Sequence, residues 1–273
     1  MAARLMQAGG RIDTRQPVNW QHPLNRGAGV WCLPLPGRSG GGTLFDLAGR
    51  YPGTLSSGVT WTAGPDGFPA VAFGSGSQSV GFGTASPVAG GAATWTLTLK
   101  WSGTAGRAIG QWGNSSAQQA WLIEVLSDGA VQLAVSNLAA TFKIVKSNTS
   151  ITAGAWVRLG VTYDAGSVSM YFDGSPQGTT VTFGTYSGSV QAGSGPIDLN
   201  NETSSATAGG LTAATDLRMY PRALAAADLA ALADQTRRGH PDTLRRYTPR
   251  AWLTASGSPP LAYTVPRITG FGW

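Results

Sequence analysis

Residue types that carry out chemistry are scarce in this chain. It has two histidines, His22 and His240, one cysteine, Cys32, and two glutamates, Glu124 and Glu202. A single cysteine excludes an internal disulfide framework. Both histidines lie near the ends of the chain, which excludes a Ser/His/Asp or Cys/His catalytic arrangement within its middle part.

Long apolar runs are missing as well. No stretch of about 18 consecutive apolar residues occurs, so a membrane-spanning helix is not expected. The first 15 residues carry charge but no apolar segment, which predicts that the chain has no secretory signal peptide. Together with the lone cysteine, this favours a protein made in a reducing cytoplasm.

Negative charge is in short supply, and the imbalance is confined to the ends of the chain. There are 19 lysines and arginines against 13 aspartates and glutamates. Residues 1–29 carry a net charge of +3 and residues 236–273 a net charge of +5, which leaves −2 for residues 30–235. Basic terminal segments are typical of arms that dock on an acidic partner.

Glycine is abundant, with 39 residues, roughly twice the usual share. Between the glycines, apolar and polar residues alternate. Residues 94–102 read TWTLTLKWS, and residues 156–174 read WVRLGVTYDAGSVSMYFDG, which is two alternating runs separated by a turn. A period of two residues predicts strands, and the second segment predicts a β-hairpin. A further strand is expected at 108–112, pairing nearby.

The hairpin at 156–174 resembles a pair of strands in LamG-like jelly-roll domains of the concanavalin A-like lectin/glucanase superfamily. The match consists of Trp156, Leu159, Val161, Thr162, Tyr163, Asp164, Val168, Met170, Tyr171, Asp173 and Gly174. Two further segments match in the right order. DLAGRYPGTL at 46–55 resembles an opening motif of the family, and TDLRMYPRAL at 215–224 resembles its closing strand.

This resemblance implies an all-β fold, a two-sheet antiparallel jelly-roll sandwich of the concanavalin A-like type. One short C-terminal helix is expected at 225–235, with extended N- and C-terminal arms outside the sandwich. The domain organisation that we predict is an N-terminal arm over 1–29, a LamG-like domain over 30–235 and a basic, aromatic C-terminal arm over 236–273.

The resemblance also indicates where catalytic or metal-binding residues would lie. Glucanases of this superfamily use acidic residues close together on one strand, and no E-x-D-x-x-E pattern occurs here. Many LamG-like domains bind Ca²⁺ through loop carboxylates, but no D-x-D-x-D-G loop is present. We therefore predict a protein that is not an enzyme, holds no metal and needs no cofactor. The aspartates near suitable loops are Asp46, Asp128, Asp198 and Asp216.

A carbohydrate site would need an exposed aromatic ring that stacks on the sugar, with polar groups beside it. The candidates for such a site are Trp112, Asn114, Tyr186 and Asn201, with Trp61 as a further ring. For each ring, the alternative is a place in the core or in an interface.

The two arms combine arginines with aromatic residues, both of which are enriched at interface hot spots. Trp20 and Leu24, among prolines, favour an extended arm that lies on another surface. The alternative for Trp20 is a place on its own domain. The stretch RRYTPRAWL at 245–253 resembles endings of phage and prophage structural proteins. The residues expected to dock a partner are Arg11, Arg15, Trp20, Arg237, Arg238, Arg245, Arg246, Tyr247, Arg250, Trp252, Phe271 and Trp273.

From these features we predict a non-enzymatic structural protein of a phage virion, made in the host cytoplasm. A capsid decoration or minor head protein fits best. Its arms would dock on the major capsid or other virion proteins, and we expect a homo-oligomer. The alternative is a carbohydrate-binding module, an adhesin or receptor-binding domain of a phage tail or cell surface, whose partner is a surface glycan. A nucleic-acid binder is disfavoured because it rests on the arms alone, and no membrane partner is expected.

Overall fold

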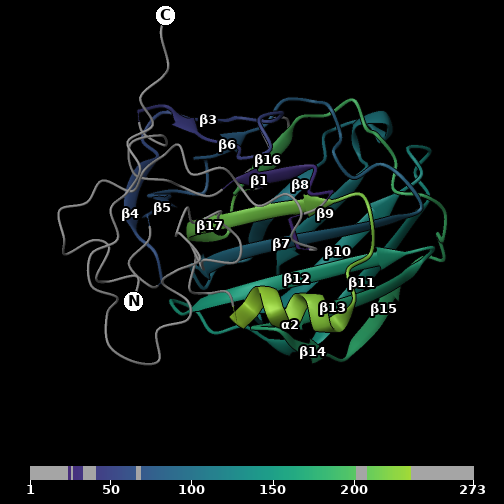
Figure 1. Ribbon diagram of the computed structural model, residues 1–273. Coiled ribbons are helices and arrows are strands. Elements are labelled where there is room, and N and C mark those ends of the chain that lie inside the picture. Colours follow the sequence, from purple (N-terminus) through teal and green to yellow (C-terminus); the bar gives the residue numbers. More distant parts are fainter. Residues whose placement is uncertain (1–23, 26, 33–40, 66–68, 201–207, 235–273) are drawn as a thin grey trace, which may run out of the picture.

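Two antiparallel β-sheets packed face to face make up most of the structure (Figure 1). They are seen in a computed structural model that describes residues 24–25, 27–32, 41–65, 69–200 and 208–234. The first sheet has eight strands, in the spatial order β14 (Ser175–Gln177), β13 (Ser167–Phe172), β12 (Trp156–Asp164), β7 (Ala92–Trp101), β17 (Leu211–Tyr220), β5 (Pro69–Ala72) and β4 (Thr60–Ala63), with β1 (Val30–Cys32) also paired with β17. The second has nine strands, in the order β15 (Thr179–Phe183), β11 (Phe142–Ser150), β10 (Ala130–Ser136), β9 (Trp121–Val125), β8 (Gly106–Gln111), β16 (Ile197–Leu199), β6 (Val80–Gly81), β3 (Gly53–Leu55) and β2 (Thr43–Leu44).

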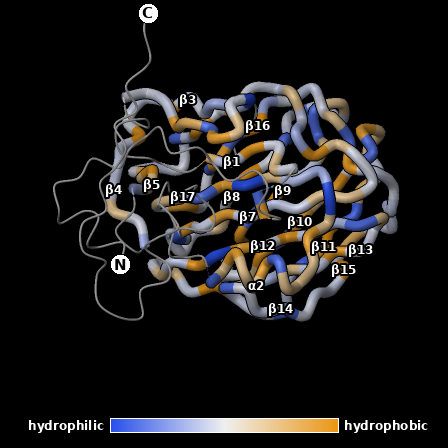
Figure 2. The backbone as a smooth tube through the Cα atoms, viewed as in Figure 1, coloured by the Kyte–Doolittle hydropathy of each residue, from blue (hydrophilic) through white to orange (hydrophobic). Residues whose placement is uncertain are grey.

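Strand β7 lies in the middle of the first sheet, and its alternating sequence explains this position. Trp95, Leu97 and Leu99 are buried on one side, where they are paired with apolar residues of β12. Burying each such side chain contributes about 1.5–3 kcal/mol before conformational entropy is counted. Trp95 also meets Trp121 of the second sheet, with 5.1 Å between the ring centroids. The main core therefore lies between the sheets, whose strands mix apolar and polar segments (Figure 2).

The jelly-roll sandwich predicted from the sequence is confirmed, and so are its hairpin and its helix. The hairpin at 156–174 is formed by β12 and β13, and helix α2 spans Ala226–Asp234. The strand expected at 108–112 is also present, as β8. Strand β8 joins the second sheet, where it pairs with β9 and β16, whereas β7 belongs to the first sheet. Alternation predicts a strand but not its sheet, because the chain crosses from one sheet to the other in the turn after β7.

Helix α2 lies across the outer side of the first sheet, in front of β12 and β13 in Figure 1. Leu229 and Leu232 of the helix are buried with Tyr171 and Tyr220 of the sheet in a second, smaller apolar cluster. Gly160 of β12 lets the helix approach closely, since a Cβ atom there would lie 3.0 Å from Cδ2 of Leu229. The helix thus covers a sheet face that would otherwise be open to solvent.

Ala225, which directly precedes α2, has no side-chain oxygen that could cap the helix. Oδ2 of Asp228 accepts a hydrogen bond from the N–H of Ala225 at 3.3 Å. Oγ1 of Thr94, in β7, accepts one from the N–H of Leu224 at 2.9 Å. An acidic residue in the first turn also complements the helix dipole. Within the described ranges, no helix is long and apolar enough to cross a membrane.

The last residues of the expected N-terminal arm pack against the sandwich. Leu24 is buried in the cluster beneath α2, and its carbonyl oxygen accepts a hydrogen bond of 2.7 Å from the hydroxyl of Tyr220. The N–H of Gly29 donates to the carbonyl oxygen of Met219 at 2.8 Å. The expectation that Leu24 lies on another surface is therefore wrong, because its side chain fills a site on its own domain.

Candidate functional site

The second sheet has one side that faces away from the first sheet, and we call this side the open face. Residues paired directly across neighbouring antiparallel strands lie on the same side of a sheet. Ile144 of β11 is paired with Ala134 of β10 and with Phe183 of β15, and Ala134 is paired with Leu122 of β9. The next residue of β10, Val135, belongs to the core, so this row lies on the open face. Phe183 is 59% exposed there.

Two aromatic rings meet on the open face. Trp112 directly follows β8, and its ring lies 5.7 Å from that of Phe142, with 37° between the ring planes. Phe142 is paired with Ser136 of β10, and Ser136 is fully buried although it points away from the core. This burial is the effect expected of rings that close over the serine. Trp112 and Phe142 themselves are only half-buried, so the pair presents an apolar surface to solvent.

A row of polar side chains lies further along the strands on the same face, and we call it the polar row. It consists of Arg107, Glu124, Gln132 and Lys146, which are paired in this order across β8, β9, β10 and β11. Nε2 of Gln132 donates a hydrogen bond of 2.6 Å to Oε1 of Glu124, and Lys146 forms an ion pair of 2.6 Å with Asp128. Burial raises the pKa of Glu124, while Arg107 and Gln132 act to lower it.

The ring pair and the polar row are separated by a short length of strand. Gln132 and Ser136 are four residues apart on β10, which corresponds to about 14 Å at roughly 3.4 Å per residue. The positions between them on the face are occupied by Ala134 and Leu122, both 4% exposed. The ring pair and the polar row therefore lie about 14 Å apart along β10 on one face of the sheet.

The backbone before Trp112 is held by the residue that precedes it. Gln111 is fully buried, and its Nε2 donates hydrogen bonds to the carbonyl oxygens of Thr84 at 2.7 Å and Gly193 at 2.8 Å. On the other side of the tryptophan, Nε2 of Gln119 donates to the carbonyl oxygen of Gly113 at 3.1 Å. The backbone is thus anchored on both sides of Trp112, which fixes the point from which its ring projects.

The structure assigns different places to the residues predicted to bind sugar. Trp112 lies on the open face, and Asn114 is exposed in the loop that follows it. Tyr186 touches the same region, since its N–H donates to the carbonyl oxygen of Phe142 at 3.4 Å. Its ring packs against the main core, and its hydroxyl lies 2.6 Å from the carbonyl oxygen of Ser189. Asn201 lies outside the described residues.

Sequence reasoning missed Phe142 and the whole polar row. A signal for part of the row was present, because the turn at 127–129 between two alternating runs sets a hairpin register in which Glu124 opposes Gln132. The position of Phe142 had no comparable local signal. The partner-docking residues predicted in the two arms all lie outside the described residues, so they remain predictions.

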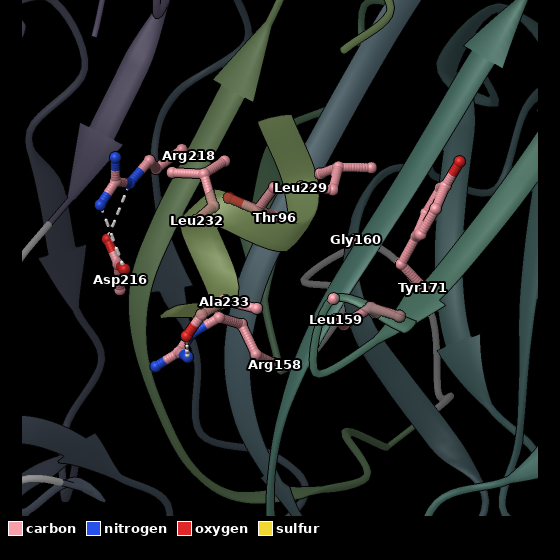
Figure 3. A pocket seen from close by; sticks show the side chains of 11 residues that line it. Thr96, Arg158, Leu159, Gly160, Tyr171, Asp216, Arg218, Leu229, Leu232 and Ala233 are labelled. Carbon is pink, nitrogen blue, oxygen red and sulfur yellow. Dashed lines mark hydrogen bonds and ion pairs between the residues drawn. The ribbon is translucent and has the colours of Figure 1, made fainter. Parts of the chain in front are cut away.

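A second candidate site lies between α2 and the first sheet (Figure 3). Its wall includes Arg158, Asp216 and Arg218, side chains that are polar but buried. The cavity holds about 10 Å³, which is room for about one water molecule and excludes a sugar or a peptide. Its charged groups serve the fold. Arg218 is bound to Asp216, and Arg158 bonds to the carbonyl oxygen of Ala233 in the helix.

The aspartates considered as calcium ligands do not come together. Asp46 is buried, and its carboxylate accepts four backbone N–H groups at 2.8–3.0 Å, which holds the loop after β2 in shape. Asp216 is paired with Arg218, and Asp128 with Lys146. Among the residues that the structure describes, there is no group of three or more His, Cys, Asp or Glu side chains that could hold a metal ion.

Comparison with protein families gives the context for this site. Residues 73–230 match the family model described as the concanavalin A-like lectin/glucanases superfamily. The chain belongs to this superfamily. The match covers the strands from β7 to β17, and hence the ring pair and the polar row. A comparison with curated protein sequences gives no match.

Solved structures of the superfamily fold resemble this concanavalin A-like domain at low sequence identity. Domain 4 of AbnA, an extracellular arabinanase from Geobacillus stearothermophilus in complex with arabinotriose, is 19% identical, with a TM-score of 0.53 over 69% of this chain and 91% of that domain. The binding domain of Paraclostridial Mosquitocidal Protein 1 is 13% identical, with a TM-score of 0.60 over 79% of this chain and 53% of that one.

The receptor-binding domain of botulinum neurotoxin C/D mosaic serotype is 10% identical, with a TM-score of 0.54 over 77% of this chain and 51% of that one. This chain therefore spans about half the length of both toxin domains. Likeness at such identity concerns the fold, which several binding domains share.

Proposed function

We propose that this protein is a non-catalytic carbohydrate-binding module that holds a glycan on the open face, against Trp112 and Phe142. The ring pair carries the proposal. Two partly exposed aromatic rings offer an apolar surface to the C–H face of a sugar, and the polar row offers partners to its hydroxyl groups. Ligand sites generally combine aromatic walls with a few well-placed polar groups in this way. The arabinotriose complex of the arabinanase domain is in keeping with it.

The charges of the polar row favour a neutral glycan over a polyanion. Lys146 is already paired with Asp128, and Glu124 accepts a hydrogen bond from Gln132. Arg107 lies next to Glu124 in the row, so the negative group lies between two positive ones, with the neutral Gln132 beside it. A polyanionic ligand would have to displace these partners, whereas hydroxyl groups can donate to and accept from the same side chains.

The non-catalytic part of the proposal rests on the acidic side chains. Asp46, Asp128 and Asp216 are each bound to backbone N–H groups or to a cationic side chain. On the open face, Glu124 is bound to Gln132. A glycosidase needs a pair of carboxyl groups a few ångströms apart on either side of the bond that it cleaves, and these carboxylates are engaged elsewhere.

Glycan-array screening of the full chain, followed by calorimetry with the best ligand, tests the proposal. Trp112→Ala should weaken binding about tenfold or more, because losing one stacked ring costs about 1.5 kcal/mol. Trp61→Ala is the matched control, since Trp61 is a half-buried tryptophan on β4 of the other sheet. The affinity of the Trp61→Ala variant for the glycan should be unchanged. Absence of any glycan ligand, or equal effects of both substitutions, would contradict the proposal.

The charge segregation of the chain favours a second function, that of a structural protein of a phage virion. Net charges of +3 and +5 in the terminal segments flank a middle part of −2, as expected of arms that dock the sandwich on a larger assembly. We place the protein in the virion as a capsid decoration or minor head protein, bound to the major capsid or other virion proteins. This role is compatible with glycan binding by the displayed domain.

Particle assembly tests this second function. The full chain should co-purify with particles, and a chain lacking residues 1–23 and 236–273 should not. Normal incorporation of the shortened chain would overturn the docking role of the arms. Salt-sensitive retention of the full chain on DNA, lost on deleting 236–273, would assign the arms to nucleic acid instead.

A further inference from the structure

Strand β15 forms one edge of the second sheet and is exposed along its length. It pairs with β11 on one side, with a shift in register between Val181 and Phe183, and all of its residues except Thr179 are exposed. Val181 and Phe183 are 53% and 59% exposed, and within the described residues they are the exposed large hydrophobic side chains. The N–H and C=O groups that do not bond to β11 point away from the sheet. Such an edge is a template for another strand.

The other sheet edges are less suited to pairing. Strand β2, at the opposite edge of the second sheet, is two residues long. Strand β14 is three residues long and has Pro176 in its middle, which removes an N–H donor. The exposed side chains of β4 are small, being those of Thr60, Thr62 and Ala63. Of these four edge strands in the described part of the chain, β15 alone combines five residues, β-branched and aromatic side chains and exposed apolar area.

We propose that β15 pairs in antiparallel fashion with β15 of a second copy of this chain, centred on Val181. A two-fold axis at this residue places Val181 opposite itself, Thr180 opposite Thr182 and Thr179 opposite Phe183. A charged residue on such an edge would meet its own charge or that of a close neighbour, which is unfavourable. Residues 174–197 contain no charged residue, so no like charges would oppose each other when this edge pairs with its own copy.

Antiparallel pairing about this axis joins the two second sheets into one continuous sheet. The rotation axis is perpendicular to the sheet, so the open faces of both copies point the same way. If the proposed glycan site is present, the dimer carries two such sites on one surface, which raises the apparent affinity for clustered glycans. The pairing itself does not depend on the glycan site.

Sedimentation velocity of the full chain over a range of concentrations provides the first test. The unaltered protein should show a dimer that dissociates on dilution. Val181→Lys should be monomeric, because two ammonium groups would face each other at the axis. Thr62→Lys, an equal change on the exposed edge strand β4, should leave the dimer intact. Circular dichroism checks that both variants fold. A Val181→Lys protein that still dimerises overturns the proposal, as does an unaltered protein that is monomeric throughout.

Disulfide trapping tests the register without a disruptive charge. The single native cysteine, Cys32, is buried, so an introduced cysteine is the accessible one. Directly opposed residues in an antiparallel pair have Cα atoms about 4.5–5.5 Å apart, within the range that a disulfide bridges. Val181→Cys should therefore form a covalent dimer under mild oxidation, whereas Thr62→Cys should not. A dimer held by the arms or by another surface would give equal cross-linking of both variants, which overturns the proposed interface.

Discussion

The guanidinium group of Arg158 donates a hydrogen bond of 2.5 Å to the carbonyl oxygen of Ala233, in the last turn of α2. Nε of the same side chain lies 3.3 Å from Oγ1 of Thr98, on the neighbouring strand β7. Arg158 is 7% exposed, so the bond is sheltered from water. A cation at the C-terminal end of a helix also meets the favourable end of the helix dipole. This side chain therefore fastens the helix to the centre of the first sheet.

Replacing this arginine should loosen the helix. Arg158→Met keeps most of the apolar stem but loses the charge-assisted hydrogen bond, so the free energy of unfolding should fall by about 1.5–3 kcal/mol. Urea denaturation measures this change. Lys100→Met is the control. Lys100, on β7, lies on the same side of the first sheet as Arg158 and is less buried. Its effect should stay within about 0.5 kcal/mol. Equal losses for the two variants would show that Arg158 does not fasten the helix.

Gly174, in the turn after β13, should be sensitive to substitution because the helix lies on it. Its φ angle is +78°, and a Cβ atom would lie 2.8 Å from Cβ of Ala233 and 3.0 Å from Cα of Ala230. Gly154 has a similar φ of +73°, with nothing within 4 Å of a Cβ atom. Gly154→Ala should cost about 1 kcal/mol for the backbone conformation alone. Gly174→Ala should lower the free energy of unfolding clearly more, as measured by thermal denaturation. Equal losses for the two variants would mean that the helix moves away from the added methyl group at little cost.

The buried pair of Asp216 and Arg218 allows a third prediction. Nε of Arg218 lies 3.0 Å from Oδ1 of Asp216, and Nε1 of Trp31 donates to the same oxygen at 3.1 Å. Asp216→Asn keeps the shape and tolerates the φ of +50°, but leaves a buried guanidinium without its counter-charge. We expect a loss of about 3–5 kcal/mol. The double variant Asp216→Asn, Arg218→Met should recover part of the lost free energy of unfolding, as measured by chemical denaturation. If the losses of the two single variants simply add in the double variant, the pair is not coupled.

The strands were predictable where the determinants are local. The β12–β13 hairpin follows from alternation and from a turn whose residues are adjacent in sequence, and the short helix follows from its leucine spacing. The sheet that β8 joins was not predictable, because it depends on where the chain crosses between the sheets. The same holds for the candidate site. Trp112 stood out as a ring beside Gly113 and Asn114, but its partner Phe142 is brought there by the β10–β11 register.

Tyr163 should make the stability of the protein depend on pH in the alkaline range. Its hydroxyl donates a hydrogen bond to the carbonyl oxygen of Gly188. Burial, with a smaller contribution from Tyr186, raises the pKa of Tyr163 to about 12. A tyrosine in the unfolded chain has a pKa of about 10. Below about pH 10 both states keep the proton, so this residue gives no pH dependence.

Between about pH 10 and 12 the unfolded chain releases the phenolic proton while the folded protein retains it, so the free energy of unfolding falls as pH rises. Urea denaturation at a series of pH values should show this fall. In Tyr163→Phe it should be shallower but not absent, because burial raises the pKa of Tyr220 as well. At neutral pH the same variant should lose about 1 kcal/mol with the hydrogen bond to Gly188. An unchanged alkaline slope in Tyr163→Phe would mean that this phenol titrates as it does in the unfolded chain.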